Sequence, residues 1–125
     1  MLSPSLKRLI NSFRHAWHGL LQVFKDEHSF RIQVFAALLV GIFAFLFPLE
    51  RWERALLVLA IGAVLVLELI NSIIERFVDI IKPRVHEYAR QLKDISAAAV
   101  LVMACTAVIL AIIIFWPHIY LLVRI

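Results

Sequence analysis

Apolar side chains recur along the first part of the chain at the spacing of an α-helix. From Leu6 to Phe24 they follow the i, i+3, i+4, i+7 pattern, while basic residues such as Arg14 fall on the other faces. Ser3 and Pro4 supply a capping side chain and a first-turn proline. The pattern predicts an amphipathic helix within residues 1–30 that lies along the cytoplasmic surface of a membrane.

The pattern leaves the end of this helix open. If the helix continued past Asp26, Glu27 would project from the edge of the apolar stripe, where a carboxylate needs a partner. A loop at Asp26-Glu27 is the alternative, and the spacing of apolar residues does not decide between the two.

Three later stretches are apolar over nearly the ~20 residues that a helix needs to cross a bilayer. They are residues 32–49, 55–74 and 95–116. Glu68 and Asn71 interrupt the second stretch, whereas the third carries no charge and is closed by Trp116-Pro117. We therefore predict an all-α membrane protein with an N-terminal surface helix and three transmembrane helices.

Composition agrees with this class. The chain has 125 residues, which allows one domain over residues 1–125. Its hydrophobic fraction is 63%, against about 45–50% in soluble domains. So small a soluble domain could not bury that much apolar surface. A single cysteine, Cys105, excludes a disulfide scaffold.

Basic residues predict the orientation. Of the 13 Lys and Arg residues, five precede the first span and five lie between the second and third. By the positive-inside rule the N-terminus is cytoplasmic and the C-terminus is outside. The net charge of +4 then reflects topology and anionic lipid, and we expect no nucleic-acid partner. The first 30 residues lack the apolar region of a cleaved signal peptide, so none is expected.

Polar residues of the second span gather on one helix face. At 100° per residue, Glu68, Asn71, Glu75 and Asp79 fall within an arc of about 80°. A charge within a membrane helix is costly and normally faces the bundle interior. Three stacked carboxylates repel one another unless cations or protons intervene, which favours a metal site. The alternative is that these groups only hydrogen-bond neighbouring helices.

The start of the third span suggests what faces the carboxylates. Lys93-Asp94 precedes four small residues, Ser96 to Ala99, and small residues let helices approach closely. We expect this approach to bring Lys93 against the acidic face. His86 by itself indicates a surface histidine. The isolated glycines form no phosphate-binding loop, so the available chemistry is that of a metal-bridged phosphate meeting a lipid-borne group.

The segment from Glu68 to Asp79 resembles a known signature. Its sequence, E-L-I-N-S-I-I-E-R-F-V-D, fits the pattern E-x-x-N-S/T-x-I/V-E-x-x-x-D of the bacterial integral-membrane diacylglycerol kinase family. The similarity covers nearly the whole chain. It extends to Trp17-His18-Gly19, Glu27, Phe30-Arg31, His86, Lys93-Asp94 and residues 98–101.

The resemblance implies a homotrimeric bundle in the bacterial inner membrane, with active sites shared between adjacent subunits. It implies transfer of the γ-phosphate of ATP to a lipid alcohol with Mg²⁺. Glu68 matches the general base beside the substrate, and Glu27 and Glu75 match the metal ligands. The positions that match residues around the nucleotide are Arg8, His15, Glu27, Glu75, His86, Lys93 and Asp94; Asn71 and Asp79 match supporting polar positions, and Ala97 a lipid contact.

Two positions depart from the enteric-type enzymes of the family. His15 stands where they have a tyrosine beside the nucleotide, and Ser96-Ala97 replaces their Gly-Ser, whose serine contacts lipid. The family's usual substrate is diacylglycerol, which becomes phosphatidic acid. A related Gram-positive branch phosphorylates undecaprenol, and the small residues and longer tail of this chain resemble that branch at least as well.

Two non-enzyme functions are alternatives to the kinase. A small membrane assembly subunit would use the polar face only for packing, yet it needs no metal-ready carboxylates. An ion conductor would use the ladder from Glu68 to Asp79. It would also need polar residues in the outer half of the membrane, and the second and third spans offer almost none there.

Overall fold

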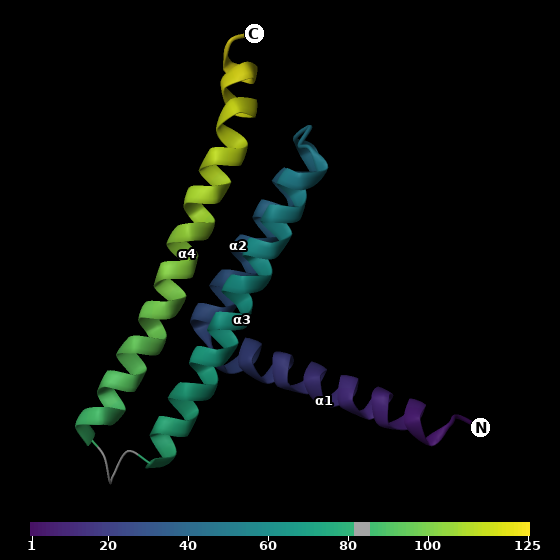
Figure 1. Cartoon of the computed structure of the whole chain (residues 1–125), viewed down its shortest axis with the longest axis vertical. Coiled ribbons are helices and arrows are strands. Elements are labelled where there is room, and N and C mark those ends of the chain that lie inside the picture. Colours follow the sequence, from purple (N-terminus) through teal and green to yellow (C-terminus); the bar gives the residue numbers. More distant parts are fainter. Residues whose placement is uncertain (82–85) are drawn as a thin grey trace.

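A computed structural model of the chain describes residues 1–81 and 86–125. Over these residues it contains four helices, α1 (Pro4–Asp26), α2 (His28–Leu46), α3 (Arg51–Ile81) and α4 (His86–Val123) (Figure 1). No strand occurs in the described ranges, and α2, α3 and α4 are each long and apolar enough to cross a membrane. The predicted all-α membrane fold is confirmed.

Helix α3 is the centre of the bundle. It packs along α4, which runs beside it in the opposite direction, and against α2 on another side (Figure 1). Helix α1 leaves the bundle at a steep angle and packs mainly on α2. One helix, α3, can therefore collect side chains from the other three.

The helices differ from the predicted spans at their ends. Helix α3 extends past residues 55–74 in both directions, whereas α2 begins at His28 and ends at Leu46 instead of covering 32–49. The early stop follows from Pro48, because the residue before a proline is biased towards extended backbone. Phe47 has φ −83° and ψ 147°, as this rule requires.

Helix α4 does not stop at Trp116-Pro117, where the sequence predicted the third span to close. It continues through Pro117 to Val123. A proline removes one helical hydrogen bond, but membrane helices tolerate this where neighbouring groups compensate. Directly after the proline, His118 Nε2 lies 3.5 Å from Glu53 Oε2 at the start of α3. This contact holds the last turns of α4 against the bundle.

At the end of the bundle that contains the α2–α3 connection, which we call the far end, apolar side chains pack together. Leu49, Leu57 and Ile114 are buried together there. Glu53 also accepts the Glu50 N–H at 2.8 Å, which caps the N-terminus of α3 in the manner of a capping box. This far end therefore serves as a rigid support for the polar end.

Helix α1 begins as the sequence predicts. Ser3 is its N-cap, and the serine hydroxyl accepts the Leu6 N–H at 3.3 Å, with Pro4 in the first turn. No residue of α1 is buried, and Phe13 on the apolar stripe is 75% exposed. Such a stripe suits contact with a lipid surface or another protein.

The helix is interrupted at Glu27, so a loop separates α1 from α2 instead of one continuous helix. Glu27 has extended backbone, with φ −107° and ψ 112°, between the end of α1 and the start of α2. The Arg31 guanidinium donates to the carbonyls of Phe24 and Lys25 at 2.9 and 2.7 Å. These bonds satisfy carbonyls at the end of α1 and set its direction relative to α2.

Candidate active site

The polar face of α3 is buried in the bundle at Glu68 and reaches the surface at Asp79. Glu68, Asn71 and Ser72 are buried. Glu75 is half-buried, and the side chain of Asp79 is 59% exposed. The face is thus a ladder of polar groups that leads from the apolar segment of the bundle towards solvent.

Glu68 is held by a side chain from α2. The Ser29 hydroxyl donates a hydrogen bond to Glu68 Oε1. A buried carboxylate is costly unless it is hydrogen-bonded, so this bond explains why Ser29 of α2 lies against α3. Sequence reasoning missed Ser29. The available signal was that Ser29 and Gln33, four residues apart, share one face of a mostly apolar helix.

Asn71 connects α3 to α4. Its amide oxygen accepts a hydrogen bond from the Ser96 hydroxyl, and its amide nitrogen donates to Glu75 Oε1 at 3.3 Å. Ser96 also donates to the carbonyl of Lys93 at 3.1 Å. A serine of α4 therefore orients the amide that in turn orients Glu75.

Lys93 contacts the acidic face, as predicted. Its ammonium lies 2.6 Å from Asp79 Oδ1. Of the small residues Ser96 to Ala99, Ser96 is buried against α3, whereas the three alanines are exposed on this chain. The expected close approach of α4 therefore depends on one serine, and the alanine surface is left on the outside.

Glu27 joins the same site from the break between α1 and α2. Its Oε1 accepts a hydrogen bond from Ser72 at 3.2 Å and lies 3.8 Å from the Arg76 guanidinium. Arg76 also pairs with Asp26 at 3.1 Å. Arg76, which the sequence marked only as an indicator of orientation, therefore fastens the end of α1 to α3.

The carboxylates suit a metal that arrives with phosphates. Among the described side chains, those of residues 1–81 and 87–125, no group of three or more from His, Cys, Asp and Glu is placed to hold a metal ion alone. Glu27 accepts a hydrogen bond from Ser72, and Glu75 of α3 accepts one from Asn71, the residue next to Ser72. Mg²⁺ is commonly held by one or two carboxylates together with substrate phosphates and water, so this pair fits it.

Other predicted site residues are not brought to Glu68 within one chain. Arg8 and His15 are exposed on α1. At the helical rise, they lie about 28 and 18 Å along the axis from Glu27. Asp94 and Ala97 are exposed on α4. The side chain of His86 lies outside the described part of the chain, as do Lys82 and Arg84.

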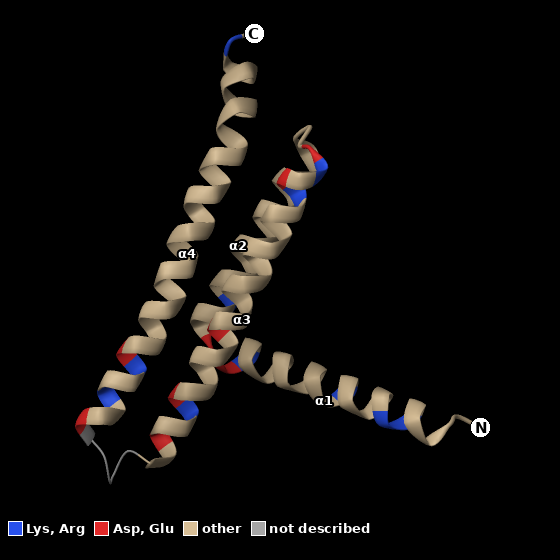
Figure 2. Ribbon diagram, viewed as in Figure 1, with Lys and Arg blue, Asp and Glu red and all other residues tan. Residues whose placement is uncertain are grey.

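Charge is divided between the two ends of the bundle. Figure 2 shows acidic and basic residues together where α1 meets the bundle and along the adjoining ends of α3 and α4. No charged residue lies between Arg54 and Glu68 of α3 or between Asp94 and Arg124, and a second small group lies near the start of α3. The end where α1 meets the bundle can therefore hold phosphates at the surface and an alcohol at the depth of Glu68.

Comparison with known proteins identifies the family of the chain. A family model described as prokaryotic diacylglycerol kinase matches residues 14–115. The chain belongs to this family. The family resemblance of the segment from Glu68 to Asp79 is thereby confirmed.

Individual relatives match over most of their length. Undecaprenol kinase of Bacillus subtilis (strain 168) is 38% identical over 112 residues, which cover 90% of this chain and 91% of the relative. Diacylglycerol kinase of Escherichia coli (strain K12) is 34% identical over 111 residues, covering 89% and 91%. A diacylglycerol kinase of Synechocystis is 40% identical over 102 residues, covering 81% of this chain and 58% of the relative.

These matches establish the class of activity. The chain is a lipid kinase, embedded in the bacterial inner membrane by apolar helices. The prediction of an enzyme is thus confirmed, and the alternatives of an assembly subunit and an ion conductor are not supported.

The bond between Ser96 and Asn71 yields a first prediction. Ser96→Ala leaves the buried amide oxygen of Asn71 without its partner, which should cost about 1–3 kcal/mol. We expect a clear fall in the melting temperature of the purified kinase in mild detergent. Thr106→Ala is the matched control, because this α4 hydroxyl is exposed and bonds the Val102 carbonyl of its own helix. Equal melting of the two variants would contradict the role assigned to Ser96.

Proposed function

We propose that the kinase transfers the γ-phosphate of ATP to a lipid alcohol, with Glu68 as general base and Glu27 and Glu75 as ligands of Mg²⁺ on the nucleotide. The ladder of polar groups on α3 carries this proposal. It links a buried carboxylate in the apolar part of the bundle to exposed charges at its end. A lipid hydroxyl and a water-soluble nucleotide can meet along it.

Depth along α3 separates the two carboxylate roles. Glu68 lies two helical turns from Glu75, about 10 Å along the axis. A lipid alcohol can place its hydroxyl at Glu68 while its hydrocarbon stays in the membrane. The nucleotide approaches from the exposed end, where Glu75, Glu27 and Lys93 lie.

In the reaction the hydroxyl oxygen of the lipid attacks the γ-phosphorus. The bond from that phosphorus to the β–γ bridging oxygen breaks, ADP leaves, and the hydroxyl proton passes to Glu68. Ser29 fixes the position of the Glu68 carboxylate by donating to Oε1. The Lys93 ammonium offsets negative charge on the transferring group. Mg²⁺, when bound, neutralises charge on the phosphates.

Replacing each of the two carboxylates, Glu68 and Glu75, by an amide should impair a different step. Glu68→Gln should abolish phosphoryl transfer and leave binding of Mg·ATP largely intact. Glu75→Gln should weaken Mg²⁺-dependent nucleotide binding, and added Mg²⁺ should restore part of it. Nucleotide titration and turnover measured on both folded variants provide the test.

Glu50→Gln is the matched control for these variants, since Glu50 is a carboxylate at the far end of the bundle and should leave both measurements unchanged. Near-normal turnover of Glu68→Gln would show that the catalytic assignment is wrong. Intact nucleotide binding by Glu75→Gln at low Mg²⁺ would remove Glu75 from the metal site.

The kinase acts as a homotrimer with its N-terminus in the cytoplasm and its sites shared between chains. The distance from Glu27 to Arg8 along a straight α1 supports this arrangement, because Arg8 cannot reach the nucleotide site of its own chain. The exposed alanines after Ser96 and the apolar stripe of α1 offer surfaces for neighbouring subunits. The excess of Lys and Arg near this end supports the orientation.

Mixed oligomers test the shared site. Arg8→Ala and Glu68→Gln should each be nearly inactive alone, but their co-expression should restore a measurable share of turnover, because some sites then take both intact residues from different chains. Native mass spectrometry in mild detergent should show a trimer. An active preparation containing only monomer would contradict the proposal, as would a co-expressed pair without activity.

Diacylglycerol is the proposed substrate, with phosphatidic acid as product. Undecaprenol is the second candidate, because the undecaprenol kinase of Bacillus subtilis is 38% identical to this chain. Ala97 adds to that case, since it has no hydroxyl to pair with a glycerol ester. The two lipids differ in the polar group next to the reacting hydroxyl, so the enzyme should distinguish them.

A competition assay decides between the two lipids. With both alcohols present in mixed micelles, we expect a higher kcat/KM for diacylglycerol. A large preference for undecaprenol would reverse the assignment of substrate and leave the kinase mechanism in place.

A further inference from the structure

Arg76 contacts two carboxylates at the junction of α1 and α2. Its guanidinium donates a hydrogen bond to Asp26 Oδ2 at 3.1 Å and lies 3.8 Å from Glu27 Oε1. An arginine side chain stays charged at every pH at which proteins work. Arg76 is therefore a permanent positive charge beside Glu27, one of the two proposed ligands of Mg²⁺.

The two contacts of Arg76 differ in kind. The contact with Asp26 is a hydrogen bond, whereas the distance to Glu27 is longer than a hydrogen bond allows. The Ser72 hydroxyl donates to the same oxygen of Glu27, Oε1, at 3.2 Å. Since both contacts fall on Oε1, the other carboxylate oxygen can turn to a metal ion while Ser72 keeps its bond. Arg76 therefore acts on a metal at Glu27 through its charge.

The charges around the proposed metal site do not cancel. Three carboxylates and one guanidinium, those of Asp26, Glu27, Glu75 and Arg76, leave two net negative charges, and Asp79 forms its own ion pair with α4. Mg²⁺ gives up its water reluctantly and is commonly held by carboxylates together with substrate phosphates. The phosphates of ATP supply the negative charge that Arg76 offsets.

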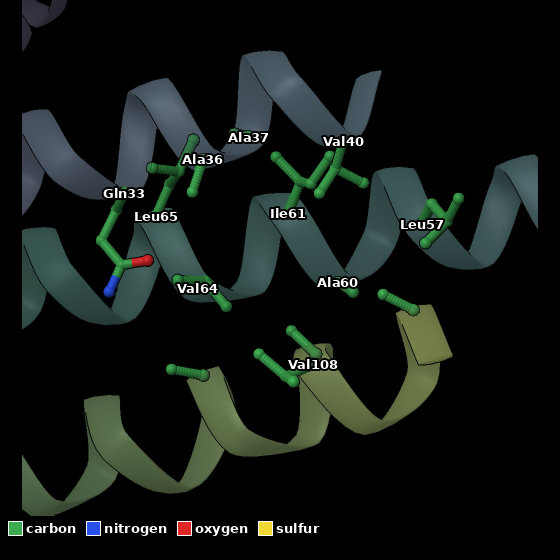
Figure 3. Close-up of a pocket in the computed structure, with 13 residues that line it drawn as sticks. Gln33, Ala36, Ala37, Val40, Leu57, Ala60, Ile61, Val64, Leu65 and Val108 are labelled. Atoms are coloured by element: carbon green, nitrogen blue, oxygen red, sulfur yellow. The ribbon is translucent and has the colours of Figure 1, made fainter. Parts of the chain in front are cut away.

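The apolar interior of the bundle offers Mg²⁺ little to bind. The pocket among α2, α3 and α4, with Gln33 at one end, is lined otherwise by apolar side chains (Figure 3). A single amide oxygen falls far short of the octahedral set of oxygens that Mg²⁺ takes. The charges at the junction of α1 and α2 therefore have the larger effect on metal binding.

We propose that Arg76 holds the site formed by Glu27 and Glu75 in a state of low affinity for Mg²⁺ until the metal arrives on the phosphates of ATP. The inference rests on the proposed Mg²⁺ site and adds the residue that makes metal binding depend on the nucleotide. Asp26 belongs to the same arrangement, because its hydrogen bond keeps the guanidinium beside Glu27.

Binding of Mn²⁺ without nucleotide measures this effect directly. Mn²⁺ takes the same oxygen ligands as Mg²⁺, and its unbound form is counted by electron paramagnetic resonance on the purified kinase in mild detergent. Arg76→Gln removes the charge and should lower the Kd for Mn²⁺ about threefold to tenfold, a modest change because the guanidinium is 41% exposed and screened by solvent. Arg76→Lys keeps a positive charge and should keep the wild-type Kd.

Asp26→Asn should shift the Kd in the opposite direction. Without the Asp26 carboxylate the site loses one negative charge and the guanidinium turns to Glu27, so the Kd for Mn²⁺ should rise about threefold. A residue that only fastened α1 to α3 would give changes of the same sign in both variants, since each breaks the same ion pair. Arg90→Gln is the matched control, because Arg90 pairs with the exposed Glu87 of α4 at 3.1 Å and should leave the Kd unchanged.

A non-hydrolysable ATP analogue tests the dependence on nucleotide. In the wild-type kinase the analogue should lower the Kd for Mn²⁺ strongly, after correction for Mn²⁺ held by free analogue. The ratio of the two Kd values should be smaller in Arg76→Gln, because its metal already binds without phosphates.

Unchanged or weaker binding of Mn²⁺ alone by Arg76→Gln would overturn the proposal. If that variant loses affinity for the analogue and keeps its Kd for Mn²⁺ alone, Arg76 contacts the phosphates instead, and the proposal fails as well. Should Arg76→Gln not fold, Asp26→Asn decides, and a Kd that does not rise would contradict the role of Arg76.

Other results separate this inference from the proposed function. If Glu27→Gln and Glu75→Gln bind Mn²⁺ with the analogue as tightly as the wild-type kinase, the proposed metal site fails and the inference fails with it. If those variants lose affinity but the changes at Arg76 and Asp26 have no effect, the inference alone fails.

Discussion

A carboxylate buried between apolar helices must be hydrogen-bonded, and this requirement at Glu68 governs the rest of the structure. Ser29 satisfies it from the first turn of α2, so α2 must lie with that turn against α3. Because α2 starts at the Glu27 break, the same placement brings Glu27 to Ser72 and Arg76. One polar contact thus determines where the end of α1 joins the bundle.

The two ends of the bundle are built in different ways. At the site end, serine, asparagine and carboxylate side chains bond across three helices, and each bond orients a group with a proposed chemical role. At the far end, Leu49, Leu57 and Ile114 pack together and Glu53 links the α3 cap to His118. The apolar end gives the polar end a fixed frame, which positioning of reacting groups requires.

A single chain brings together some of the predicted site residues and leaves others apart. The ladder from Glu68 to Asp79 and the adjoining Lys93 are assembled within it, but the basic residues of α1 project away (Figure 2). Exposed apolar side chains cover α1 and much of α4. Such surfaces are stable only against lipid or another protein surface.

The sequence by itself determined the helical membrane fold, the polar face of α3, the contact of Lys93 with that face and the family. These follow from local periodicity, length and a dense motif, all of which act within one helix. Tertiary structure decided the break at Glu27, the passage of α4 through Pro117 and the pairing of Ser29 with Glu68. The reason is physical. Each depends on a partner far away in the chain, and spacing along one helix carries no information about which side chain of another helix will satisfy it.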